Sequence, residues 1–386
     1  MCKLKFIVVL CLAAIFVVTI VILPGCKEEA AETTLAPETV IVKETVVETV
    51  IQEVEKESTY TYEKLREMAK AGAYEGEPAK GHKLAFANFL ASFSVCQLVE
   101  QSIKEQWALA GGAEEDLIIL DNAYDSAIAV QNADIVFNKK PEVFIQFQFD
   151  SRVNAMIAKK ASELEVFMIG IDVPVPVFPF MGVNNYGASV LMGEYLVDQI
   201  PKVYGSWDNV DLMIYPWNPP LGDTVKLRML GSIDTLVEAF GESANPGDVL
   251  GQKPEGSKTV IIGGGSVAAE AQAETTNILN ANPNARNIIF FALDDQVANG
   301  GQAAADILKV WDPEKWLVVS QGCDELGVKS IRNGIIDADV AYFFEKYGEY
   351  CVPGALAQMY GNPVPAAMYV ENVVLTKDNI DEYYPE

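Results

Sequence analysis

The sequence is poor in the residues that most metal and nucleophile chemistry requires. It has a single histidine, His82, and its six cysteines form no Cys-x-x-Cys pair. Zinc sites are built from cysteines and histidines at short, regular spacings, and hydrolytic triads need a histidine beside the nucleophile. The sequence therefore argues against zinc chemistry and His-dependent catalysis, and it predicts no cofactor and no metal site.

Basic residues are also scarce. Lysine and arginine together number 28 against 54 aspartates and glutamates, which gives a formal net charge of −26. A surface this acidic repels the phosphates of nucleic acids and the headgroups of anionic lipids. We therefore expect no nucleic-acid partner. Half of the residues are apolar, so the chain can still form a substantial core.

The N-terminus has the layout of an export signal. Lys3 and Lys5 precede an apolar run over residues 6–22, which ends in Leu-Pro-Gly-Cys at Cys26. This ending resembles the lipobox of bacterial lipoproteins, in which the peptide is cut before the cysteine and the cysteine carries the lipid. We expect residues 1–25 to be a lipoprotein signal peptide. The alternative is a retained transmembrane anchor, because about 20 apolar residues span a bilayer. Both interpretations place the rest of the chain outside the cytoplasm.

Residues 26–60 are low in complexity. They repeat Glu-Thr-Val, carry alternating charge and have no aromatic residue before Tyr60. Such a segment cannot close a core of its own, which predicts a flexible tether, although its β-branched repeats could also form an extended or paired segment. Residues 61–81 are expected to be a helical lead-in, with a short helix over 62–73.

Three cysteines lie beyond the signal and its cleavage site: Cys96, Cys323 and Cys351. An odd number outside the cytoplasm permits one disulfide, between Cys323 and Cys351. The pattern favours three buried thiols instead.

From His82 onward, apolar runs alternate with helix-length amphipathic stretches. The strand-like runs are residues 83–89, 116–121, 143–149, 166–172, 210–215, 259–263, 287–293 and 316–320. The helical stretches are residues 95–110, 152–163, 188–199, 224–240, 268–280 and 296–309. Buried strands that alternate with helices predict an α/β fold with parallel sheets covered on both faces, here as two doubly wound lobes.

Ligands of such sheets bind at the carboxyl ends of the strands. These ends are residues 89–93, 121–122, 150, 172, 215–218, 294–295 and 321–324. Acidic and aromatic residues dominate them. Such a set can accept hydrogen bonds from hydroxyl groups while a ring covers an apolar sugar face, or it can hold a cation.

Several segments occur in the order and spacing of a known family. They are KLAFANFLASFSVCQLVEQSIKEQ, FMIGIDVPVP, VNNYGASVLMGEYLV, FFALDDQVANGGQAAADIL and VVSQGCDELGVKSIRNGIIDADVAYF. From His82 to the C-terminus the chain resembles the type 1 periplasmic binding proteins, in particular the ribose/galactose-like sugar receptors of ABC importers. The resemblance implies two lobes joined by a three-strand hinge near residues 183–185, 341–343 and 369–374. The N-terminal lobe would comprise residues 82–184 and 343–372, and the C-terminal lobe residues 185–342 and 373–386.

The resemblance also implies roles for particular residues. Phe93 resembles the aromatic that covers one sugar face, and Asp172 the carboxylate that pairs with sugar hydroxyls. Lys226 or Arg228 lies near the position of the family's cleft arginine, and Asp294 takes the place of an asparagine or aspartate. The chain departs from the family at four positions: Val173 for arginine, Gln321 for an aromatic residue, Gly322 for aspartate and Tyr342 for an amide. These departures argue against ribose as the ligand.

The candidate ligand-binding residues combine these positions with the strand ends. They are Phe93, Asp150, Asp172, Trp217, Lys226, Arg228, Asp294, Asp295, Gln321 and Tyr342. Trp217 and Tyr342 could replace lost stacking surfaces, and Asp294, Asp295 and Asp324 could replace lost acceptors. For Asp295 the simpler interpretation is a cap on the following helix.

The predicted function is that of a solute-binding protein, not an enzyme. It would be a monomer outside the cytoplasm, fixed by a lipid to a bacterial cell membrane, which binds a sugar-like small molecule by lobe closure and delivers it to an ABC permease. A sensory receptor that presents its ligand to a chemoreceptor or sensor kinase is the main alternative.

Two enzyme hypotheses are weaker. Gly263, Gly265 and Ala268 form a GxGxxA turn, but the candidate acid, Asp294, lies farther along than the roughly 20 residues of a dinucleotide site. Asp294 and Asp295 could suggest glycoside hydrolysis, but adjacent side chains after a strand generally point apart.

Overall fold

A computed structural model describes residues 60–217, 219, 222–265 and 267–385 of the chain. The predicted signal peptide, Cys26 and the tether as far as residue 59 lie outside these residues and stay predictions. Within the described part of the chain, no helix combines the length and apolar character that a membrane crossing requires.

The first sheet has six parallel strands in the order β11-β5-β4-β3-β1-β2. Their bounds are β1 (Leu84–Asn88), β2 (Leu117–Asp121), β3 (Val143–Phe147), β4 (Phe167–Ile171), β5 (Phe180–Gly182) and β11 (Ala367–Tyr369). Every residue of β1 and β3 is buried, as expected for parallel strands covered on both faces. The strand order reverses between β1 and β3, so the carboxyl edge there is a topological switch point.

The second sheet repeats this arrangement in the order β12-β10-β9-β8-β6-β7. Its strands are β6 (Leu212–Pro216), β7 (Thr259–Ile262), β8 (Ile288–Phe291), β9 (Trp316–Gly322), β10 (Ala338–Ala341) and β12 (Val373–Thr376). All pairs are parallel except β10 with β12, which is antiparallel. The prediction of two doubly wound, mainly parallel sheets is confirmed.

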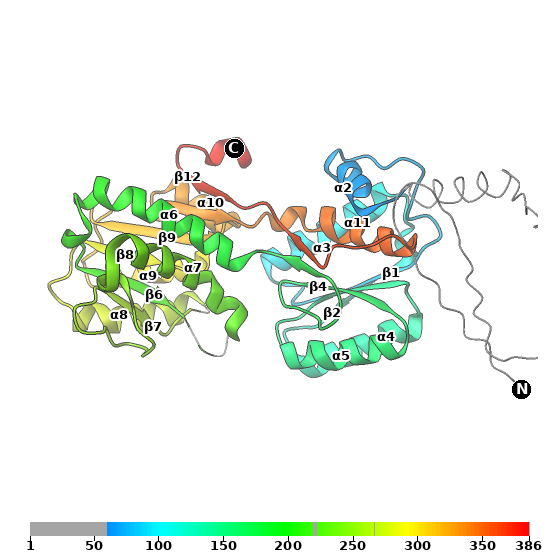
Figure 1. The fold of residues 1–386 in the computed structure, drawn as a ribbon, viewed down its shortest axis with the longest axis horizontal. Helices are drawn as coiled ribbons and strands as arrows, with labels where there is room; N and C mark the ends of the chain where they lie inside the picture. Colours follow the sequence, from blue (N-terminus) through cyan, green and yellow to red (C-terminus); the bar gives the residue numbers. More distant parts are fainter. Residues whose placement is uncertain (1–59, 218, 220–221, 266, 386) are drawn as a thin grey trace, which may run out of the picture. The chain divides into compact units, whose positions relative to one another are not determined.

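Helices cover both faces of each sheet. In the first lobe they are α3 (Ser94–Leu109), α4 (Ser126–Lys139), α5 (Ser151–Glu163) and α11 (Gly348–Met359). In the second they are α6 (Asn185–Tyr204), α7 (Gly222–Phe240), α8 (Ala268–Ala281), α9 (Asp295–Ile307), α10 (Glu325–Arg332) and the terminal α12 (Ile380–Tyr383). Figure 1 shows α4 and α5 on one face of the first sheet and α3 and α11 on the other.

The core of the first lobe follows from strand alternation. Phe144 of β3 packs in one apolar cluster with Ala133 of α4 and Ile157 of α5. The neighbouring residues of the strand, Val143 and Ile145, belong to the larger cluster that includes α3 and α11. Successive side chains of a strand point to opposite faces, so β3 is apolar throughout and serves both cores.

The chain passes between the two sheets three times. The connections are residues 183–184 before α6, residues 342–347 before α11, and residues 370–372 between β11 and β12. They coincide with or border the three segments expected as the hinge. Strands β5, β10, β11 and β12 had no counterpart among the predicted strand runs.

A short helix, α2 (Tyr62–Lys70), precedes the first strand and packs on α11. Thr61 caps its N-terminus, and Leu65 is fully buried. Arg66 forms an ion pair with Glu349 at 2.9 Å and lies over the ring of Tyr350 at 3.5 Å. The predicted helix is present, but it ends three residues earlier than expected.

The three cysteines of the described residues, Cys96, Cys323 and Cys351, are free and buried. The favoured expectation of three buried thiols is therefore confirmed, and the alternative disulfide is absent. The ring of His82 contacts the carboxylate of Glu142 at 2.9 Å. No group of three or more His, Cys, Asp or Glu side chains in the described residues is arranged to hold a metal ion.

Candidate functional site

Asp172 follows β4 at the carboxyl edge of the first sheet. Its side chain is 7% exposed, and the Tyr347 hydroxyl donates a hydrogen bond to Oδ1 at 3.0 Å. Its backbone has a positive φ of 58° and is fixed by a 2.9 Å hydrogen bond from its N–H to the carbonyl of Met181. Burial raises the pKa of this carboxyl to about 6, although Arg228 and Tyr347 both favour its charged form.

Arg228 on α7 of the second lobe carries the positive charge of the site. Its Nε donates to Asn185 Oδ1 at 3.1 Å and its Nη1 donates to the Leu293 carbonyl at 3.2 Å. The guanidinium is close enough to Asp172 and to Asp294 to lower the pKa of both carboxyls, against the effect of burial. Asp172, Arg228 and Asp294, which we call the charged centre, thus join groups from the two lobes.

Gln321 and Tyr342 lie behind Arg228 and are fully buried. The Gln321 amide donates to the Arg228 carbonyl at 2.6 Å and accepts a hydrogen bond from the Tyr342 hydroxyl at 2.7 Å. The Arg228 guanidinium lies 5.0 Å from the centre of the Tyr342 ring. Gln321 and Tyr342, which were predicted to contact the ligand, therefore contact and position Arg228 in this structure.

Asp294 and Asp295 differ in role from the expectation. Asp294 caps α9 by accepting a 2.9 Å hydrogen bond from the Val297 N–H, because its extended backbone turns the carboxylate toward the helix start. Burial raises its pKa to about 6. The expectation that Asp295 is the cap was wrong, since Asp295 is already the first helical residue.

Asp295 instead points into the second lobe and is 4% exposed. It accepts hydrogen bonds from the Ser320 hydroxyl at 2.9 Å and from the Asp324 N–H at 3.0 Å. It also contacts Asp339 of β10, which is fully buried. Burial, helped by the negative charges of Asp324 and Asp294, raises the pKa of Asp295 to about 7, although the hydrogen bond with Asp339 acts in the opposite direction. This residue holds the loop after β9 in place.

Asp150 and Phe93 each directly precede a helix of the first lobe. Asp150 caps α5 and accepts hydrogen bonds from the Arg152 N–H and the Ser126 hydroxyl, both at 3.0 Å. The Arg152 side chain, followed by the Ser126 hydroxyl and the Arg152 N–H, lowers the pKa of Asp150. Phe93 precedes α3 and is partly buried against the large apolar cluster.

Trp217 and Lys226 form the remaining pair of predicted site residues. Trp217 directly follows β6, and the Lys226 ammonium lies 5.5 Å from its ring centre, within cation–π range. The indole N–H is buried and has no hydrogen-bond partner among the residues that the structure describes. Residues 218, 220 and 221, which follow in sequence, lie outside the described part of the chain.

Sequence reasoning missed two residues that contact the charged centre, Tyr347 and Asn185. Tyr347 is fully buried, and its hydroxyl is committed to Asp172. No sequence signal marks it, because it is one of several aromatic residues after β10. Asn185 stands in the segment VNNYG, where the crossing between lobes was recognised but a contact with Arg228 was not.

The chemistry of this arrangement is that of polar binding. Two carboxylates and a guanidinium can accept and donate charge-assisted hydrogen bonds, which are about twice as strong as neutral ones. The thiols of Cys96, Cys323 and Cys351 have pKa values raised by burial, which keeps them protonated and unreactive.

Comparison with known proteins bears on the family and the fold. Residues 85–363, well over half of the chain, match a family described as "Periplasmic binding protein domain". No curated protein is similar enough to the chain to count as a match.

Solved structures show the same fold at low sequence identity. A periplasmic solute-binding protein of an ABC transporter from Actinobacillus succinogenes 130z, with bound D-allose, has 20% identity and a TM-score of 0.64 over 78% of this chain and 100% of that one. A periplasmic ribose ABC transporter protein from Conexibacter woesei has 16% identity and a TM-score of 0.66 over 80% and 96%. A glucose-galactose binding protein from Geobacillus stearothermophilus has 16% identity and a TM-score of 0.62 over 78% and 99%.

Proposed function

The chain belongs to the periplasmic binding protein family, and from this premise we propose that it is a membrane-anchored extracytoplasmic receptor for a small sugar-like molecule. It delivers this ligand to an ABC importer permease and catalyses no reaction. The observation that carries the proposal is the charged centre, in which the buried Asp172 of one lobe comes together with the partly buried Arg228 and Asp294 of the other.

The charged centre suits a ligand rich in hydroxyl groups. A hydroxyl can donate to Asp172 or Asp294 and accept from Arg228, and a hydrogen bond to a charged group contributes roughly 1.5–3 kcal/mol. Two carboxylates oppose one guanidinium, which disfavours an anionic ligand. The three solved structures of similar fold support a sugar as the ligand, because one contains D-allose, one is a ribose ABC transporter protein and one is a glucose-galactose binding protein.

Binding proceeds by closure of the lobes. A ligand that contacts residues of both lobes stabilises the closed state, because only in that state can both lobes contact the ligand at once. We assign residues 82–184 and 343–372 to the first lobe and residues 185–342 and 373–386 to the second.

The anchor completes the proposal. Residues 1–25 are removed as the signal peptide, Cys26 carries the lipid, and residues 26–60 tether the receptor near its permease. Mass spectrometry of the membrane-extracted protein should find Cys26 as the modified N-terminal residue. An unprocessed N-terminus would contradict this part.

A ligand screen tests the binding function. The chain without residues 1–25 and with Cys26→Ser is mixed with pentoses, hexoses, polyols and nucleosides, and its melting temperature is recorded, since a ligand of the folded state raises this temperature. A hit should bind at least tenfold more weakly to Asp172→Asn, while Asp134→Asn on the surface should bind normally. Chemical conversion of the hit during incubation would contradict the receptor function.

A further inference from the structure

An aromatic cluster at the carboxyl edge of the first sheet takes no part in the charged centre. It consists of Phe89 after β1, Phe147 at the end of β3, Phe149 two residues later and Tyr124 after β2. Phe89 is the buried base of the cluster. Phe149 and Tyr124 stand nearly perpendicular to it, at 4.4 Å and 77° and at 5.0 Å and 86°.

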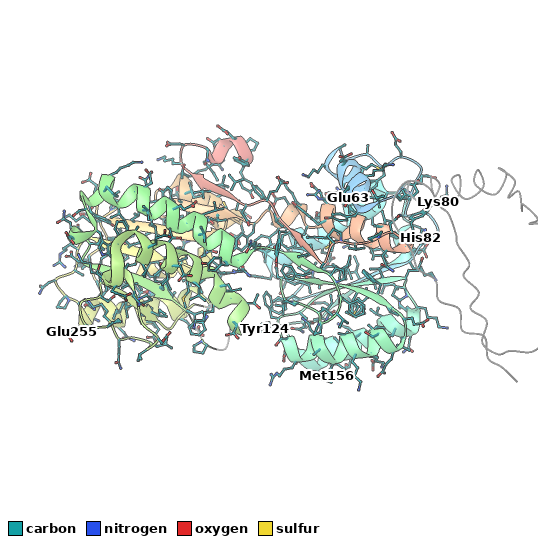
Figure 2. All side chains as sticks on the ribbon, viewed as in Figure 1. Glu63, Lys80, His82, Tyr124, Met156 and Glu255 are labelled. Atoms are coloured by element: carbon teal, nitrogen blue, oxygen red, sulfur yellow. The ribbon has the colours of Figure 1, made fainter. Side chains whose placement is uncertain are left out.

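The two outer rings are exposed. Phe149 is 39% and Tyr124 is 73% exposed, whereas Phe89 is 7% exposed. A cluster of large, exposed aromatic rings on a protein surface commonly marks a site that binds a ligand or another macromolecule. Figure 2 labels Tyr124 and also Met156 of α5, an apolar side chain that is not part of the cluster and is 62% exposed.

The position of Tyr124 is fixed by its backbone. Ala123 and Tyr124 have positive φ values of 50° and 57°, a conformation that is costly for residues other than glycine. The Tyr124 N–H donates to the Phe89 carbonyl at 3.0 Å, and Asp121 Oδ1 accepts from the Ala123 N–H at 2.8 Å. The exposed ring is therefore held in place against Phe89.

The cluster lies beside the charged centre along the edge of the sheet. The strand order β4-β3-β1-β2 places Phe149 one strand from Asp172 and Tyr124 three strands from it. With neighbouring strands about 4.8 Å apart, the aromatic rings extend to about 14 Å from the position of Asp172. A ligand that uses both sets of groups must be longer than one sugar ring.

We propose that the ligand is a glycoside in which the sugar carries a planar, uncharged ring system. This inference rests on the proposed function. The sugar hydroxyls bind at Asp172, Arg228 and Asp294, and the planar ring stacks on the exposed faces of Tyr124 and Phe149. Aromatic side chains stack on planar rings with little dependence on their substituents, so nucleosides and aryl glycosides are suitable probes.

Isothermal titration calorimetry of paired ligands tests the proposal. Adenosine is compared with D-ribose, and 4-nitrophenyl β-D-glucoside and β-D-galactoside with the free hexoses. At least one glycoside should bind tenfold or more tightly than its free sugar. Tyr124→Ala and Phe149→Ala should each weaken that glycoside roughly 5- to 150-fold and leave the free sugar unchanged. Tyr124→Phe should retain the affinity, and the control Met156→Ala should change neither ligand.

The possible failures are distinguishable. If free sugars bind as tightly as their glycosides, or if the ring variants weaken both equally, the aromatic cluster is not a ligand subsite and the inference is wrong. If neither free sugars nor glycosides bind, or if Asp172→Asn leaves the affinity of every binding probe unchanged, the proposed function itself is wrong.

Discussion

Replacing Asp172 by asparagine should make the ligand-free protein more stable at neutral pH. Burial raises the pKa of Asp172 from 3.8 to about 6, so the folded state binds this proton more tightly than the unfolded state. The stabilising contribution is therefore complete below about pH 3.8 and is lost as the pH rises through about 6. At pH 7.5 the folded protein contains a buried, ionised carboxylate that asparagine would replace with a neutral group.

The size of the effect follows from this shift in pKa. Roughly 1.4 kcal/mol per pKa unit gives an upper limit of about 3 kcal/mol for the gain in unfolding free energy at pH 7.5. Proton linkage predicts that about 1.4 kcal/mol of this gain disappears between pH 7.5 and pH 5, where the natural aspartate is itself mostly protonated. Asparagine keeps an acceptor for the Tyr347 hydroxyl and tolerates the positive φ of this position.

Urea denaturation at pH 7.5, 6 and 5, followed by tryptophan fluorescence, measures this difference. Bound ligand must first be removed by unfolding and dialysis, because it would stabilise the natural protein selectively. Asp134→Asn is the matched control: Asp134 is half exposed and paired with Lys160, so its replacement should change the unfolding free energy by less than about 1 kcal/mol. A difference between Asp172→Asn and the natural protein that is the same at all three pH values would refute the reasoning.

Two further substitutions test other parts of the structure. Arg66→Ala should lower the unfolding free energy by about 2–4 kcal/mol in the same denaturation assay, because it leaves Glu349 unpaired in a largely buried position. Lys70→Ala is the control: it breaks the exposed ion pair with Glu371 and should lower the unfolding free energy by less than about 1 kcal/mol. Asp339→Asn should raise the unfolding free energy more at pH 7.5 than at pH 5. Burial and Asp295 raise the pKa of Asp339 well above its usual value, so the stability that the protonated aspartate contributes is lost as the pH rises. The same gain at both pH values, or a loss of stability at pH 7.5, would contradict this.

The fold could be predicted from the sequence because most of its strands lie in continuous apolar runs that are separated by amphipathic helices. The runs expected at residues 83–89 and 143–149 contain β1 and β3. The second expected run is longer than β3 by two residues, Gln148 and Phe149, because the apolar pattern continues past the last paired residue of the strand. Short strands such as β5 escape this reasoning. Three residues show no alternation, and their pairing depends on the neighbouring strand β4.

The site could be predicted where a residue follows closely after a strand, and Arg228 on α7 only through the resemblance to the family. Asp172 was found from its place after a strand, and the same rule pointed to Asp294 and Asp295 without separating their roles. Which of two adjacent aspartates caps a helix depends on the backbone angles at the first of them, and the burial of Asp295 depends on strands β9 and β10. Tyr347 reaches Asp172 through the tertiary fold alone, since 175 residues separate them.

The central claim is that a small polyhydroxylated ligand draws the two lobes together, and energy transfer between two dyes tests it most directly. The natural thiols of the described residues are buried, so dyes can be attached after Met156→Cys on α5 and Ile307→Cys on α9, two exposed positions in different lobes. The best ligand from the screen should change the transfer efficiency in a saturable way, with a midpoint that matches the calorimetric affinity. In Asp172→Asn the midpoint of this change should lie at a ligand concentration at least tenfold higher. Calorimetric binding without any change in transfer efficiency would contradict closure of the lobes around the ligand.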